Sequence, residues 1–90
     1  MSILIDQPRW PAHGRLWAHL ISDADLDELH AFAEANALPR RSFDRDHYDV
    51  PEEAHARLVA AGARSVDGHT LVRALMASGL RVTARERRGL

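Results

Sequence analysis

The sequence predicts a single small domain of the α/β class. Its length of 90 residues leaves room for one compact domain. Short apolar runs are typical of buried strands, and amphipathic segments with helix caps follow them. Because helices separate the later strands, part of the sheet is expected to be parallel. We therefore expect a sheet of about three to four strands and about three helices within residues 1–83, then a basic tail, residues 84–90, that is frayed.

The first two strands are predicted by their apolar side chains. Residues 3–5 form a short apolar run that stops at Asp6. Residues 6–14 contain two prolines and a glycine, so we expect a loop there. Residues 16–21 predict a second strand whose two faces are both largely apolar, as in a central, covered strand. One face of that strand carries Trp17, His19 and Ile21.

The first helix is predicted by its cap and its apolar stripe. It begins near Asp23 or Asp25, either of which can cap it, and Glu28 follows Asp25 at the spacing of a capping box. Pro39 ends it. Its buried stripe is expected to consist of Leu26, Leu29, Phe32 and Ala33.

The second half of the chain predicts two more helices and two short strands. Residues 40–49 show no regular pattern and are expected to form a loop or a strand, and a helix is expected between Pro51 and Gly62. Residues 63–66 predict a strand, Asp67 caps a third helix, and Gly79 closes it. Residues 80–83 predict a final strand.

Composition excludes several classes of protein and favours self-association. The chain has no Cys, which excludes disulfides, thiolate zinc sites and cysteine nucleophiles. It has neither a signal-peptide pattern nor an apolar stretch of membrane-spanning length, so we expect a cytoplasmic protein with no membrane partner. Fifteen residues are Ala and only 21 are Leu, Ile, Val or Phe, so the core is thin. A homodimer would compensate for this by burying more apolar surface.

The first functional hypothesis is a divalent metal site. Imidazole and carboxylate groups together suit Zn, Mn or Fe, and the candidate ligands are Asp6, His19, His47 and Asp49. Asp6 and His47 are the candidate catalytic residues, because a metal-activated water could attack a phosphoester beside them. Two simpler interpretations stay open: Asp6 caps the loop that follows it, and His19 is a hydrogen-bonded core histidine.

The second hypothesis is a phosphate site that needs no metal. The candidate ligand-binding residues are Arg9, Trp10, Arg40, Arg41 and Tyr48. Arginines form charge-assisted hydrogen bonds with phosphate, and Trp10 or Tyr48 could stack on a base. This would make the protein a nucleotide- or nucleic-acid-binding module. The alternative is that the arginines form ion pairs with the acidic first helix.

A third hypothesis is a non-catalytic homodimer in which the aromatic and His residues stabilise the interface. The thin core favours it. The concentration of Asp, His and Arg at loop positions counts against it, because an interface has little need of that combination.

Three stretches of the chain resemble a small bacterial family, domain of unknown function 4031: PRWP at 8–11, WAHL at 17–20 and HYDVP at 47–51. The resemblance covers about residues 3–82. It implies a shared fold, and no catalytic residue can be carried over from it.

Overall fold

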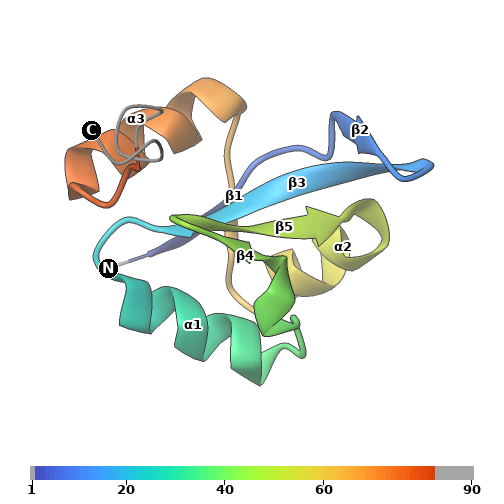
Figure 1. Ribbon diagram of the computed structural model, residues 1–90, viewed down its shortest axis with the longest axis horizontal. Helices are drawn as coiled ribbons and strands as arrows, with labels where there is room; N and C mark the ends of the chain where they lie inside the picture. Colours follow the sequence, from blue (N-terminus) through green and yellow to red (C-terminus); the bar gives the residue numbers. More distant parts are fainter. Residues whose placement is uncertain (1, 83–90) are drawn as a thin grey trace.

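The computed structural model describes residues 2–82, which form a mixed sheet and three α-helices (Figure 1). The helices are α1 (Leu26–Ala35), α2 (Glu52–Ala60) and α3 (Gly68–Ser78), with a short 3-10 turn η1 (Arg40–Ser42). The strands are β1 (Ile3–Ile5), β2 (Trp10–Ala12), β3 (Arg15–Ser22), β4 (Phe43–Asp44), β5 (His47–Pro51) and β6 (Arg64–Ser65). The predicted α/β class and the three helices are confirmed, but within the described residues the sheet has six strands and not three to four.

The strand order β4-β5-β3-β1-β6 places β3 at the centre of the sheet, as predicted. β3 pairs antiparallel with β1, β2 and β5, and β1 pairs parallel with β6. The carboxyl ends of β1 and β6 therefore meet at one edge, where Asp6 follows β1 and Asp67 comes shortly after β6. On the β3–β5 ladder His19 lies directly opposite Asp49.

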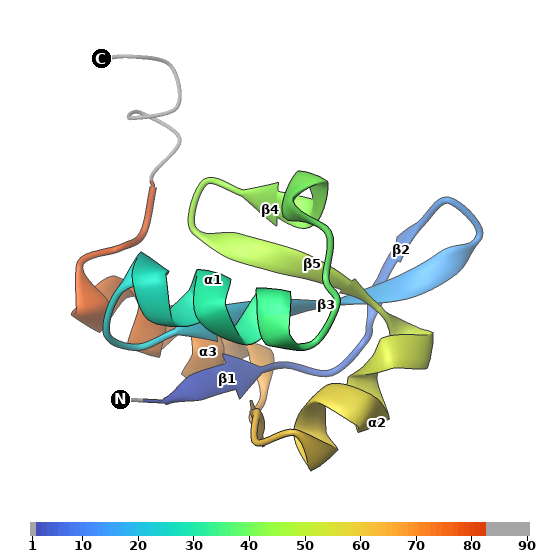
Figure 2. The ribbon, with the colours of Figure 1, turned by 90° about the horizontal axis from the view of Figure 1, so that it is seen from below.

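The helices cover the two faces of the sheet unequally. α1 and α2 pack on one face of the sheet (Figure 2). The larger core cluster lies there and includes Leu20, Leu29, Val50 and Leu58, all fully buried. α3 packs on the other face, and the buried residues of that smaller cluster are Leu4, Ile21, Leu71 and Leu75. The small cluster involves only β1 and β3 of the sheet, so the β3–β5 part of this face is left for polar side chains. Each buried Leu or Ile stabilises the fold by about 1.5–3 kcal/mol.

Helix caps follow the sequence closely. Asp25 caps α1 by accepting a hydrogen bond from the Glu28 backbone N–H at 2.7 Å, and Asp67 caps α3 through Thr70 in the same way. Gly79 ends α3 with φ of 81°, a left-handed conformation that favours glycine. The predicted capping box is only half formed, because the Glu28 carboxylate accepts from Ser22 Oγ at 2.5 Å.

Three segments differ from the sequence prediction. The expected loop at 6–14 contains β2, which pairs only with β3, and an edge strand tolerates Pro11. The expected irregular stretch at 40–49 contains the β4–β5 hairpin, whose two-residue turn holds Arg45 at φ of 62°. That conformation is usually taken by Gly or Asn, so the sequence carries no turn signal there. Residues 80–82 are not a strand.

The remaining predictions on the carboxyl terminus fall on residues 83–90, which lie outside the described part of the chain. These are the end of the expected last strand and the basic tail. Within residues 2–82 no helix is long and apolar enough to cross a membrane.

Candidate metal centre

Two histidines and a carboxylate meet on the part of the sheet that α3 leaves open. His19 of β3 and Asp49 of β5 are directly opposite in the ladder, and His47 lies two residues before Asp49 on the same face. The imidazole rings of His19 and His47 make an edge contact with centroids 5.2 Å apart. One ligand atom from each of the three residues lies within 4.8 Å of the others. Small side-chain rotations can bring three such atoms to the roughly 2.0–2.2 Å that a bound metal requires.

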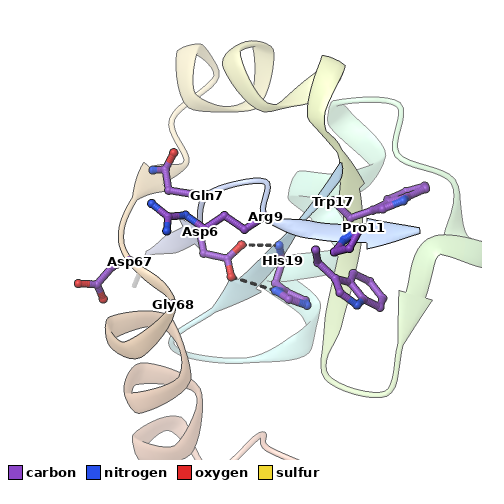
Figure 3. Close-up of a pocket in the computed structure, with 9 residues that line it drawn as sticks. Asp6, Gln7, Arg9, Pro11, Trp17, His19, Asp67 and Gly68 are labelled. Atoms are coloured by element: carbon purple, nitrogen blue, oxygen red, sulfur yellow. Dashed lines mark hydrogen bonds and ion pairs between the residues drawn. The ribbon is translucent and has the colours of Figure 1, made fainter. Parts of the chain in front are cut away.

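The Asp6 carboxylate orients His19. Its Oδ1 accepts a hydrogen bond from the His19 backbone N–H at 2.6 Å, and its Oδ2 lies 2.9 Å from Nδ1 of the ring (Figure 3). An ionised carboxylate only accepts hydrogen bonds, so Nδ1 is the donor in this contact and Nε2 is the nitrogen that a metal would use. The Asp6 backbone is held in turn, because His55 Nε2 lies 3.0 Å from its carbonyl oxygen. Asp6 is therefore a partner of His19 and not a member of the three-residue cluster.

Asp46 orients His47 in the same manner. Its side chain is fully buried, with Oδ1 lying 2.7 Å from His47 Nδ1 and Oδ2 accepting from the Val82 backbone N–H at 2.8 Å. His47 Nε2 lies 3.1 Å from Asp49 Oδ1. Each histidine thus has a carboxylate at Nδ1, and Nε2 of His47 contacts Asp49 within the cluster. This is the arrangement that commonly fixes the ring of a metal-binding histidine.

The charges around His47 favour a cation. Burial lowers the pKa of His47, but the hydrogen bonds to Asp49 and Asp46 and the charges of these two carboxylates outweigh burial and raise the pKa above its usual value. The side chain of His47 is only 12% exposed, so solvent screens these charges weakly. The cluster therefore offers two imidazoles and a carboxylate in a negative environment, and a divalent metal bound there would displace the proton that these carboxylates favour on His47.

Trp10 joins three cavities around this cluster. Its indole stacks on the His19 ring with centroids 5.4 Å apart. A cavity of about 450 Å³ contains Arg9 and Asp6, and one of about 300 Å³ contains His47 and Arg81. The third, which we call the tryptophan cavity, has a volume of about 330 Å³, and its walls are Trp10, Ala12, His13, Trp17, Arg41, Ser42 and Asp49. A ligand can thus approach the cluster from more than one side.

The structure brings together most, but not all, of the residues singled out from the sequence. The four candidate metal ligands (Asp6, His19, His47 and Asp49) gather at one place, with Arg9, Trp10 and Arg41 beside them.

Tyr48 and Arg40 point elsewhere. Tyr48 is 1% exposed in the core under α1, because strand alternation turns it away from His47, and its hydroxyl lies 2.7 Å from His30 Nδ1. Arg40 Nη2 lies 3.3 Å from the other nitrogen of that ring. The structure therefore places both residues at the His30 ring and not at the cluster.

Sequence reasoning missed Asp46, although it directly precedes His47. Its role depends on the turn of the β4–β5 hairpin, which no sequence signal marked.

Fold and cluster together define a small α/β domain with two histidines and one carboxylate on the open face of its sheet. The chain belongs to the family described as protein of unknown function (DUF4031), whose model matches residues 3–78. This confirms the resemblance carried by the PRWP, WAHL and HYDVP stretches. No curated protein and no solved structure matches the chain.

Proposed function

We propose that this protein binds one divalent transition metal through His19, His47 and Asp49. The observation that carries the proposal is that each histidine has its own carboxylate at Nδ1, while one ligand atom from each of His19, His47 and Asp49 lies within 4.8 Å of the others. Two imidazoles and one carboxylate suit Zn²⁺, Mn²⁺ or Fe²⁺, and three protein ligands leave coordination positions for water and substrate.

An ion-pair network without a metal explains this arrangement less well. One buried His–Asp pair is an ordinary way to satisfy a core histidine. Here His19 pairs with Asp6 and His47 pairs with both Asp46 and Asp49, and the side chain of His19 is 33% exposed beside two of the cavities, so it is not a core residue. The Asp46 carboxylate is fully buried with Arg81 Nη1 3.9 Å from its Oδ2, and an orienting role explains its place at His47 Nδ1.

The reaction that best suits such a site is hydrolysis of a phosphoester. A bound metal would lower the pKa of its water and polarise a phosphoryl oxygen. The water oxygen bonds to phosphorus as the bond from phosphorus to the ester oxygen breaks. One water proton ends on the departing alcohol, and the other remains on the phosphate. Arg41 shares the tryptophan cavity with Asp49, where its guanidinium can hold the phosphate by charge-assisted hydrogen bonds.

Metal content and calorimetry test the proposal. The untagged full chain is analysed for metals, stripped with chelator, and titrated with Zn²⁺ and Mn²⁺. We expect one ion per chain, a lower melting temperature after chelation, and recovery on adding metal.

Variants then assign the ligands. His19→Gln and Asp49→Asn should each weaken binding by at least about 100-fold, since even the partners behind metal ligands contribute about 10–100-fold. His69→Gln is the matched control, because His69 is an exposed histidine of α3 outside the cluster. Absence of stoichiometric binding, or equal binding by all three variants, would contradict the proposal. The homodimer and the nucleic-acid-binding module stay predictions.

A further inference from the structure

We infer that the ligand of this centre is a nucleoside phosphate whose base stacks in the tryptophan cavity while its phosphate lies between Arg41 and the metal. This inference rests on the proposed metal site and names the class of substrate for it. It starts from the two tryptophans of the chain, which line both this cavity and the one of about 450 Å³. Of these two cavities, the tryptophan cavity is the one that contains Arg41 and Asp49.

The two indoles are held in place by the β2–β3 pairing. Trp10 lies directly opposite Trp17 in the register of these strands. The Trp17 ring is fixed by its Nε1–H, which donates to the Ala12 carbonyl at 2.9 Å. Trp10 is fixed by its stacking on His19. A rigid aromatic wall of this kind binds a flat ring with little loss of side-chain entropy.

Trp10 is placed at a cost to the fold. It is 44% exposed, although the chain is short of large apolar side chains and burying an indole would stabilise its thin core. The exposed indole lies beside the metal ligands and in the wall of three cavities. Base stacking on such an aromatic surface stabilises a complex by about 1–3 kcal/mol per base.

Arg41 supplies the charge that a phosphate needs. It is exposed, it lines the tryptophan cavity, and its guanidinium makes no ion pair with any residue from 2 to 82. Asp49, a ligand of the proposed metal, lines the same cavity. A phosphate bridging Arg41 and the metal would leave the rest of its ester facing the indoles.

Size and polarity distinguish a nucleoside phosphate from simpler phosphates. At about 330 Å³ the cavity lies in the usual range for small-ligand sites, roughly 300–1,000 Å³. Inorganic phosphate or a sugar phosphate would use Arg41 and the metal but leave the indoles without a partner. A free nucleotide and the phosphorylated end of a single strand present the same base and phosphate, so both are sources of this chemistry.

The experiment is a set of calorimetric titrations of the full chain. Each variant is first saturated with Mn²⁺ at a concentration set by its own metal affinity. The ligands are AMP, ribose 5-phosphate, inorganic phosphate, phosphotyrosine and a tetranucleotide with a 5′-phosphate. We expect AMP to bind at least about 10-fold more tightly than ribose 5-phosphate, because only AMP can stack.

Three variants assign the contacts. Trp10→Leu should weaken AMP binding by about 5- to 150-fold and leave ribose 5-phosphate binding nearly unchanged. Arg41→Gln should weaken both ligands. Arg45→Gln is the control, because Arg45 lies on the adjacent hairpin turn and does not line the cavity. Its Nε lies 4.0 Å from Asp44 Oδ1. Tighter binding of the tetranucleotide than of AMP would identify the strand end as the source, and equal binding would identify the free nucleotide.

Failure of this inference can be told apart from failure of the metal site. Equal binding of AMP and ribose 5-phosphate by a protein that binds Mn²⁺ would overturn the inference and leave the metal site intact. Tighter binding of phosphotyrosine than of AMP would also overturn it. A chain that binds no metal would overturn both.

Discussion

Replacing Asp6 by Asn tests the orientation of His19 with the smallest possible change. Asn has nearly the shape of Asp, but one of its two terminal atoms is a donor. In the protein both Asp6 oxygens accept, Oδ1 from the His19 backbone N–H at 2.6 Å and Oδ2 from His19 Nδ1 at 2.9 Å. If the amide oxygen keeps the backbone bond, its NH₂ group faces Nδ1. The ring must then move its hydrogen to Nε2, where it blocks the metal.

The opposite amide orientation also fails. It would satisfy Nδ1 but place the NH₂ group against the His19 backbone N–H, so that two donors meet. In the first orientation the ring carries its hydrogen on the wrong nitrogen, and in the second the variant loses the hydrogen bond to the backbone. Partners of this kind contribute about 10–100-fold to metal affinity, so we expect Asp6→Asn to weaken Zn²⁺ binding by about 1.4–2.8 kcal/mol.

Competition of the protein with a chromophoric chelator for Zn²⁺ measures this loss. Long-range ¹H–¹⁵N spectra of the metal-free protein report which nitrogen of His19 carries hydrogen, and we expect Nδ1 in the wild type and Nε2 in the variant. Asp27→Asn is the control, since it removes an exposed carboxylate on α1, on the other face of the sheet. Wild-type Zn²⁺ affinity in Asp6→Asn, together with lost affinity in His19→Gln, would refute the orienting role of Asp6.

Three further predictions test the second histidine, a helix cap and the core. Asp46→Asn should weaken Zn²⁺ binding by about 10–100-fold, measured by the same competition, and should lower the melting temperature because the buried carboxylate also accepts from Val82. Unchanged affinity would remove Asp46 from the site. Asp25→Ala should lower the free energy of unfolding in urea by about 0.5–2 kcal/mol, because α1 loses its cap; an unchanged midpoint would contradict this. Burial and the charge of Arg40 lower the pKa of His30 below 6.5 in the folded protein, so the unfolded chain binds more protons at this residue. The contribution of His30 to stability is therefore full above pH 6.5 and is lost as the pH falls towards the pKa of the folded state. Urea titrations from pH 7.5 to 5 measure how steeply the free energy of unfolding falls as the pH is lowered. We expect a shallower fall in His30→Gln than in the wild type, and an identical fall would contradict the prediction.

The parts of the fold that the sequence predicted have strong local signals. The apolar runs of β1 and β3, the caps at Asp25 and Asp67, and the glycine after α3 are each explained by chemistry within a few residues. β2 and the β4–β5 hairpin have no such signal. β2 contains a proline that only an edge position permits, and the hairpin turns at an arginine in a left-handed conformation.

The candidate site also depends on contacts that local sequence signals do not show. Sequence reasoning grouped His19, His47 and Asp49 by residue type, and the β3–β5 ladder brings them together. Tyr48 is a candidate ligand-binding residue by its type alone, in a stretch whose sequence shows no regular pattern. Once β5 is a strand, alternation separates His47 and Asp49 from Tyr48. That Asp6 contacts His19 and lies outside the cluster follows only from the pairing of β1 with β3.

X-ray absorption at the zinc edge tests the central claim most directly. The protein is stripped of metal, loaded with one equivalent of Zn²⁺, and measured beside His19→Gln. We expect two imidazole nitrogens at about 2.0–2.1 Å from each zinc, with oxygen ligands in the remaining coordination positions. The His19→Gln variant should show one imidazole fewer. A shell of oxygen alone, or an unchanged shell in His19→Gln, would contradict a metal centre at His19, His47 and Asp49.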